Sequence, residues 1–225
     1  MVLYVDDLFL TGADPLIQQC KSERASKFEI KDLELMDYIL GLEVWQRLGE
    51  IFLSHVKYVV KLLERFGMVH CKSVSTPMEL NFKKLSGNTV GPMLENPTEY
   101  QQLMGALMFL VNSHPDICFA ENTMSQHMVD PHHIHQIGAK NLLRYLRDTI
   151  NHGLRYTAGS LRLHGYTDAD RVGSVVDRKS TFECFFTLGF ASISWMSRKQ
   201  KSVALSTDKA EYIATSMVCC EVVWL

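Results

Sequence analysis

The sequence predicts an α+β fold, in which strands and helices occupy separate stretches of the chain. Short apolar runs rich in β-formers occupy the first ten residues and residues 38–53. Residues 161–225 read as three strands followed by a helix. Helical apolar spacing occurs in three earlier segments, namely residues 54–66, 98–112 and 132–148.

The composition is that of a globular protein. The 225 residues are 47% apolar and 21% charged, which suits one large or two small domains. The net charge of −2 gives no overall basic field, so contacts with phosphates must come from local patches. No apolar run approaches the ~20 residues of a membrane span, and we expect no signal peptide and no membrane partner. Six cysteines lack C-x-x-C spacing and are expected to be reduced thiols of an intracellular protein.

A predicted hairpin opens the chain. Residues 1–5 are apolar and β-rich, Asp6 and Asp7 interrupt them, and residues 8–10 resume the pattern. The two carboxylates should therefore lie at the hairpin tip. As a bare dipeptide, two aspartates at a turn are usually only turn chemistry.

The following elements are predicted from Pro, Gly and apolar spacing. Asp14 and Pro15 open a helix that should end near Lys27, and residues 28–33 should be extended. Leu48-Gly49 is the predicted turn between paired strands at residues 38–46 and 51–53. Residues 79–97 hold Gly, Asn, Ser and two prolines with little periodicity, and are the best linker candidate.

Two carboxylates in the C-terminal segment suggest a metal site. Residues 161–165 read as a strand that carries Asp168 at its C-terminal end, and Ser206 offers a cap for a helix with Glu211 in its first turn. Such carboxylates can hold Mg²⁺, and two ions about 4 Å apart stabilise the attacking and leaving oxygens of a phosphodiester. The alternative is a turn aspartate and a helix-terminal glutamate without metal, and spacing alone leaves both open.

The same segment holds the densest basic cluster of the chain. Its predicted strands cover residues 178–187 and 191–195, with Gly189 in the turn. Close to Trp195, the cluster can hold a nucleic-acid backbone, although a solvated strand edge kept soluble by lysines is an equal alternative. The cluster comprises Arg178, Lys179, Arg198, Lys199 and Lys201.

Four histidines are a weaker metal candidate. They surround Asp130-Pro131, but no cysteines stand at ligand spacing, and a polar loop leading into a helix is the favoured interpretation. They are His127, His132, His133 and His135.

Motifs spread over nearly the whole chain, in order and at matching spacing, resemble copia-type LTR-retrotransposon Pol polyproteins. In the N-terminal half they are L-Y-V-D-D-L-F-L-T-G, F-E-I-K-D-L, Y-I-L-G-L-E-V and L-L-E-R-F-G-M. The C-terminal half adds L-M-G-A-L-M-F-L, L-L-R-Y-L-R-D-T, Y-T-D-A-D, I-S-W-M-S-R-K-Q and A-E-Y-I-A.

The resemblance implies a partial reverse-transcriptase palm and a helical connection, followed by a truncated RNase H-like β-β-β-α unit. The expected boundaries are 1–78 for the palm and thumb region, 79–97 for the linker, 98–160 for the connection and 161–225 for the RNase H-like unit.

The resemblance also implies catalytic, metal-binding roles for Asp6 and Asp7 in the palm and for Asp168 and Glu211 in the nuclease. Tyr4 would lie near the template-primer, and Asp170 would stand just outside the metal ligands. The implied cofactor is Mg²⁺ or Mn²⁺, and the implied partners are template-primer, RNA–DNA hybrid and the remaining polyprotein segments.

Two features lead us to expect little activity from this chain alone. It resembles a fragment at both ends, so that each site has two carboxylates where the family uses three or more. Two carboxylates poorly compensate the four positive charges of two Mg²⁺ ions, so metal binding should be weak. Departures such as Glu183 in place of a glycine, and Arg171 in place of a tryptophan, suggest a degenerate copy.

Two other interpretations stay open. The chain is either a non-catalytic remnant that at most binds nucleic acid through the basic cluster, or an unrelated α/β protein whose aspartates are only turn and cap residues.

Overall fold

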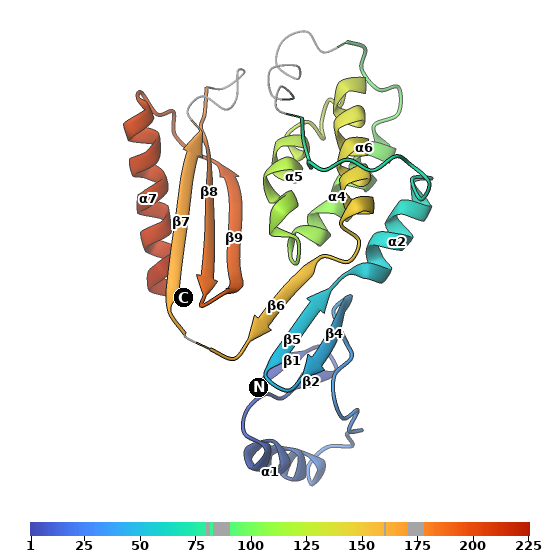
Figure 1. Ribbon diagram of the computed structural model, residues 1–225, viewed down its shortest axis with the longest axis vertical. Coiled ribbons are helices and arrows are strands. Elements are labelled where there is room, and N and C mark those ends of the chain that lie inside the picture. The colour runs from blue at the N-terminus through green and yellow to red at the C-terminus, as the bar shows by residue number, and fades with distance from the viewer. Residues whose placement is uncertain (80–81, 83–90, 160, 171–177) are drawn as a thin grey trace. The chain divides into compact units, whose positions relative to one another are not determined.

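The computed structural model describes residues 1–79, 82, 91–159, 161–170 and 178–225, and confirms a mixed α and β architecture. The chain divides into two compact units, Met1–Met36 and Asp37–Leu225 (Figure 1). Most of the predicted linker, residues 80–81 and 83–90, lies outside the described residues.

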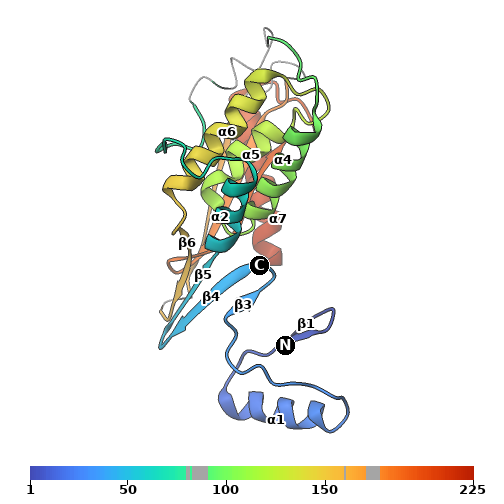
Figure 2. The same ribbon diagram turned by 90° about the vertical axis from the view of Figure 1, so that its right-hand side faces the viewer.

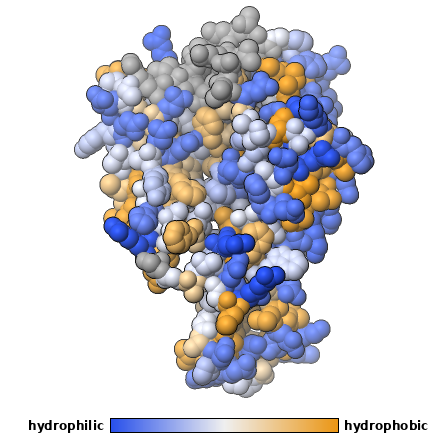
Figure 3. Space-filling view, viewed as in Figure 1, coloured by the Kyte–Doolittle hydropathy of each residue, from blue (hydrophilic) through white to orange (hydrophobic). Residues whose placement is uncertain are grey.

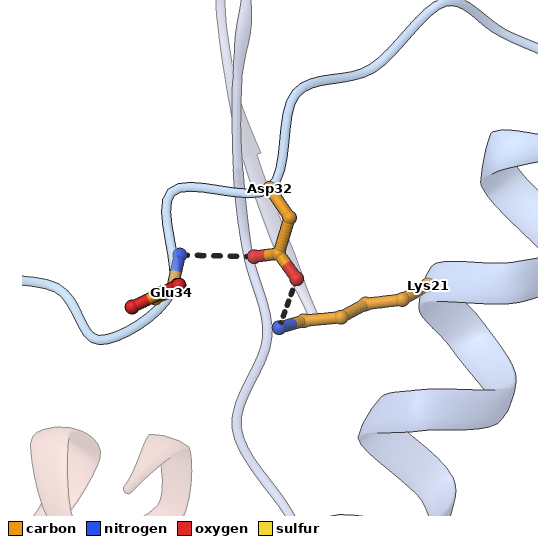
Figure 4. Close-up of polar contacts among 3 residues, drawn as sticks. All are labelled: Lys21, Asp32 and Glu34. Atoms are coloured by element: carbon orange, nitrogen blue, oxygen red, sulfur yellow. Dashed lines mark hydrogen bonds and ion pairs between the residues drawn. The ribbon is translucent and has the colours of Figure 1, made fainter.

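The first unit contains the predicted hairpin and helix. Strands β1 (Val2–Tyr4) and β2 (Asp7–Phe9) pair antiparallel, and α1 (Asp14–Ala25) has proline in its first turn. Residues 28–33, predicted to be extended, form no strand. Lys21 Nζ lies 2.7 Å from Asp32 Oδ2, and Glu34 N donates to Asp32 Oδ1 at 2.9 Å (Figure 4). The hydrogen bond from Lys21 lowers the pKa of Asp32, and the ion pair ties this segment back to α1.

A four-stranded antiparallel sheet of order β3-β4-β5-β6 opens the second unit. The predicted strand at residues 38–46 is divided by a turn at Leu40-Gly41, where both φ angles are positive, at 49° and 90°. The predicted turn at Leu48-Gly49 is confirmed between β4 and β5. The strands are β3 (Tyr38–Ile39), β4 (Leu42–Arg47), β5 (Glu50–Ser54) and β6 (Gly153–Thr157).

One apolar core joins the helices on both sides of residues 79–97. It combines α2 (Val56–Arg65) with α4 (Thr98–Val111), α5 (Cys118–Ser125) and α6 (His133–Asp148), which lie side by side in Figure 2. A short 3₁₀ turn, η1 (Pro115–Ile117), connects α4 to α5. The fully buried members include Val59, Met104, Leu107, Leu110, Ile117, Met124, Leu142, Leu143 and Leu146. The predicted helices are therefore confirmed, because each buries an apolar face here.

The predicted β-β-β-α order is confirmed at the C-terminal end. Strands β7 (Leu163–Asp170), β8 (Thr181–Leu188) and β9 (Ala191–Lys199) form an antiparallel sheet, and Gly189 turns between β8 and β9 with a φ of 62°. Helix α7 (Thr207–Trp224) covers one face, with Ala210 and Ala214 packed on Ala169 and Phe182. Figure 1 shows this sheet between α7 and the helices α4 to α6.

Large apolar side chains remain exposed on both units. On α7, Tyr212 is 78% exposed and Trp224 is 80% exposed. Figure 3 shows apolar patches among the hydrophilic residues on the face in view. Within the described residues, no helix combines the length and apolar character needed to cross a membrane.

Gly153 is the position in the second unit where packing most clearly demands glycine. A Cβ there would overlap the Leu53 carbonyl oxygen and the Phe52 ring. We expect Gly153→Ala to lower the free energy of unfolding by about 1–3 kcal/mol, because backbone and ring must both shift. Urea unfolding measures this.

Gly105→Ala is the matched control, since Gly105 lies in α4 and a Cβ there meets nothing within 4 Å. It should stabilise the unit by roughly 0.5–1 kcal/mol through helix propensity. Equal effects of the two substitutions would contradict the packing argument.

Candidate functional site

The aspartate pair lies on the β1–β2 hairpin, as the sequence predicts. Val5 and Asp6 form the two-residue turn, and Asp7 opens β2 directly opposite Tyr4. Both carboxylates and the Tyr4 ring are exposed to solvent. The hairpin thus presents two adjacent acidic side chains that a cation can reach.

Val5 holds an unusual backbone conformation at this turn. Its φ is 51°, in the left-handed region that β-branched residues avoid. Such strain costs on the order of 1–3 kcal/mol, and it gathers at sites where geometry matters for function. Sequence reasoning missed this feature, because Val5 continues the apolar strand pattern and gives no turn signal.

Asp168 does not stand at the end of a short strand. Strand β7 continues to Asp170, because Ala169 is buried under α7 and residues 163–170 all pair with β8. Asp168 lies opposite Glu183, which in turn lies opposite Ser197 of β9. Ser197 Oγ lies 3.3 Å from Glu183 Oε1, and Asn122 Nδ2 of α5 donates to the same hydroxyl at 3.3 Å.

Glu211 lies on α7, which covers one face of the β7–β9 sheet. Ser206 caps α7 by accepting from Lys209 N at 3.1 Å, as predicted, and half-buried Glu211 follows about one turn later. Alternate residues of a strand point to opposite faces. Since α7 packs on the face of Ala169, the Asp168 side chain points to the face that α5 approaches.

This arrangement decides what the acidic residues can hold. Asp168 is brought next to Glu183, and two carboxylates directly opposite one another repel. Asp168 lies on β7 and Glu211 on α7, and α7 packs on the face of β7 that carries Ala169. In the part of the chain that the structure describes, no three His, Cys, Asp or Glu side chains form a metal-binding group.

The structure brings the two basic stretches together. Gln200 N donates to Ser180 O at 2.8 Å, so the start of β8 and the end of β9 are neighbours. The indole N–H of Trp195 donates to Val111 O of α4 at 2.7 Å, which ties β9 to α4. Three members of the cluster, Arg178, Arg198 and Lys201, are exposed.

The histidines around Asp130 organise the start of α6. His132 N donates to His135 Nδ1 at 3.0 Å, and His132 Nδ1 lies 2.8 Å from Gly91 O. The rings of His127 and His135 stack with centroids 3.8 Å apart. These contacts give His132 and His135 a capping role, which supports the predicted polar loop before a helix.

Sequence reasoning missed a buried polar group between β5 and α4. Ser113 Oγ hydrogen bonds His55 Nδ1 and lies 2.9 Å from His114 Nδ1. The three residues are at most 2% exposed. Their hydrogen bonds join the end of β5 to the end of α4, and no reactant reaches them. The sequence could not predict this contact, because His55 and His114 each stand alone in an apolar stretch.

Known proteins match the chain over its whole length. Residues 1–80 match the family described as reverse transcriptase (RNA-dependent DNA polymerase). The chain is 39% identical over 227 residues to the retrovirus-related Pol polyprotein from transposon RE1 of Arabidopsis thaliana, and spans 15% of that protein. It is 38% identical over 235 residues to the one from transposon TNT 1-94 of Nicotiana tabacum, and spans 18% of it.

A shorter relative matches nearly end to end. An uncharacterized mitochondrial protein of Arabidopsis thaliana is 34% identical over 226 residues, and the chain covers 93% of it. No solved structure matches the chain.

The buried titratable groups predict acid lability. Burial lowers the pKa of His55 and of His135 to about 4, and burial raises the pKa of Glu121 to about 7. The histidines stabilise the fold fully above pH 6.5, and this contribution is lost as the pH falls towards 4. Glu121 acts in the opposite direction, since its contribution is present below pH 4.5 and is lost as the pH rises to 7.

Between pH 7 and pH 4.5, His55 and His135 should each lower the free energy of unfolding by about 2 kcal/mol, and Glu121 should raise it by about the same amount. The net loss of stability should therefore be about 2 kcal/mol. Urea unfolding at several pH values measures this. Glu121→Gln removes the opposing group and should steepen the loss. A stability that rises on acidification would contradict the assignment.

Proposed function

This chain belongs to the copia-type retrotransposon Pol polyprotein family, and from that premise we propose that it is a Pol segment related to RNA-directed DNA polymerase and ribonuclease H, without turnover on its own. In the whole polyprotein the corresponding chemistry would be metal-dependent nucleotidyl transfer and hydrolysis of the RNA strand of an RNA–DNA hybrid. Its partners there would be template-primer, hybrid and the other polyprotein segments.

The proposed organisation follows the sequence boundaries. Residues 1–78 would correspond to the palm and thumb region, 79–97 to a linker, 98–160 to the connection and 161–225 to the RNase H-like unit. The match of residues 1–80 to the reverse-transcriptase family supports the first assignment. The antiparallel β7–β9 sheet with α7 on one face is compatible with the last.

The strained acidic hairpin is the observation that carries the polymerase assignment. Asp6 and Asp7 are exposed side by side on a turn that Val5 holds at a φ of 51°. In the whole polyprotein we assign them as ligands of Mg²⁺ or Mn²⁺, with Tyr4 beside the template-primer. A bound divalent ion would supply charge stabilisation at the reacting phosphate.

The two carboxylates of the RNase H-like unit, Asp168 and Glu211, are too few for an active nuclease, in line with the proposed inactivity of this chain alone. We assign Asp168 and Glu211 as metal ligands in the whole polyprotein, with Asp170 beside them. Two carboxylates poorly compensate the four positive charges of two Mg²⁺ ions, so we infer weak divalent binding by this segment.

A second candidate function is nucleic-acid binding without catalysis. The closeness of Ser180 and Gln200 supports it, because it places the basic residues that precede β8 beside those at the end of β9. Exposed arginine and lysine side chains there can contact phosphates without regard to sequence.

The inactivity proposal is tested with a purified sample and an RNA–DNA hybrid. We expect no Mg²⁺-dependent cleavage above the level of Asp168→Asn, because two carboxylates poorly compensate the charge of two Mg²⁺ ions. Gel analysis of labelled RNA measures it. Cleavage by the natural sequence that Asp168→Asn abolishes would show that the chain is a nuclease.

Binding through the basic cluster is tested by charge reversal. Arg198→Glu with Lys201→Glu should weaken binding of a labelled oligonucleotide and reduce the slope of log affinity against log salt by roughly 1–2. Fluorescence anisotropy across a salt series measures both quantities.

The control reverses two lysines on exposed helix positions, Lys61→Glu with Lys140→Glu. It makes the same change in net charge and should leave the slope nearly unchanged. Equal effects of the two pairs would mean that net charge alone, and not this cluster, drives binding.

A further inference from the structure

A pocket on the four-stranded sheet is lined by none of the residues assigned above. Its volume is about 450 Å³, within the range of sites for small organic ligands. Strands β4, β5 and β6 supply most of its wall. We call it the Trp45 pocket, and it is lined by Glu43, Trp45, Arg47, Glu50, Phe52, Ser54, Val56, Asn151 and Arg155.

The strand register explains why these side chains gather. Trp45 lies opposite Phe52, and Phe52 lies opposite Arg155, so the three form one row across the sheet. Residues opposite one another share a face, and successive residues alternate. The other face carries Val44 and Leu154, which are buried, so the pocket is on the face that the core leaves uncovered.

Two aromatic rings form the floor of this row. Phe52 lies over Gly153, because a Cβ at position 153 would overlap its ring. Trp45 is 64% exposed, which is high for the largest apolar side chain. Exposed aromatic rings on a sheet face are the platform on which unpaired bases stack in several RNA-binding folds.

Ser54 adds an unused polar group. It is 0% exposed, it lines the pocket, and within the described residues its Oγ has no hydrogen-bond partner. Buried hydroxyls are normally hydrogen bonded. A ligand does not reach this hydroxyl without local movement, whereas Asn151 is exposed and lines the same pocket.

Two arginines of the pocket lining can contact an anion. Glu50 is 3.1 Å from Arg155 Nε, and Glu43 is 3.2 Å from Lys57 Nζ, so both acidic side chains are paired. Arg47 is exposed in the row next to Arg155. The lining thus holds two arginines and two paired acids, and arginine suits both phosphate and the face of a base.

We propose that the Trp45 pocket binds an unpaired nucleotide of a single-stranded nucleic acid, with the base stacked on Trp45 and Phe52 and the phosphate beside Arg47 and Arg155. Stacking on an aromatic ring is worth roughly ten- to hundredfold in affinity per base, which is too little for a free nucleotide and sufficient within a strand held at several phosphates. The inference deepens the proposed function and rests on it for the choice of a polynucleotide.

The test measures binding of a labelled oligo-dT by fluorescence anisotropy at low salt. Trp45→Ala should weaken binding about tenfold or more, and Trp45→Phe, which keeps a ring, should weaken it less. Trp224→Ala removes another exposed tryptophan and should change nothing. Equal loss from Trp45→Ala and Trp224→Ala would overturn the proposal.

Competitors separate the base from the phosphate. An abasic oligonucleotide should compete poorly, and so should dTMP at the same nucleotide concentration. If the abasic strand competes as well as oligo-dT, binding depends on charge and not on the base. If dTMP competes as well as oligo-dT, the pocket is a mononucleotide site. Either result overturns the inference.

The two nucleic-acid proposals fail in different ways. If Trp45→Ala binds normally while Arg198→Glu with Lys201→Glu does not, the pocket is excluded and the basic cluster stands. If the natural sequence binds no oligonucleotide, both are overturned.

Discussion

Pairing between β5 and β6 is the constraint on which the larger unit depends. It joins the hairpin before α2 to the strand after α6, so that all the helices of the core lie between two paired strands. Gly153 permits the pairing, because Phe52 and the Leu53 carbonyl occupy the space of a side chain. Tyr156 then donates to Ser192 O at 3.0 Å, which attaches the second sheet to the first. The core, the Trp45 pocket and the position of β9 all follow from this one alignment of strands.

The local residue pattern predicted most helices and strands. The full length of β7 and the Trp45 pocket depend instead on pairing between residues far apart in the sequence. Apolar spacing placed α2, α4 and α6 within a residue or two, and Ser206 marked the start of α7. The alternation at residues 161–165 predicts a strand with Asp168 at its C-terminal end, and burial of Ala169 under α7 extends β7 to Asp170. The Trp45 pocket had no local signal, since it depends on β6, roughly a hundred residues away from β5.

The two acidic sites illustrate different relations between motif and geometry. At the hairpin, neighbouring residues of the sequence are neighbours in space, so the motif is sufficient to place Asp6 and Asp7. At β7, the motif fixes which residues are acidic, but the face on which Asp168 lies depends on the register with β8. A shift of one residue would exchange the two faces. The motif therefore carries less information about convergence at the second site than at the first.

The long separation between β5 and β6 also constrains how the chain is made. The β4–β5 hairpin emerges early during synthesis, but its second partner follows roughly a hundred residues later, at five to twenty residues per second. For several seconds the edge of β5 is available to any other extended segment, which is a known route to aggregation. Non-local closure of this kind is slow, which prolongs the exposure of β5. The mutational tolerance of β6 should thus be limited by solubility during synthesis as much as by the stability of the finished fold.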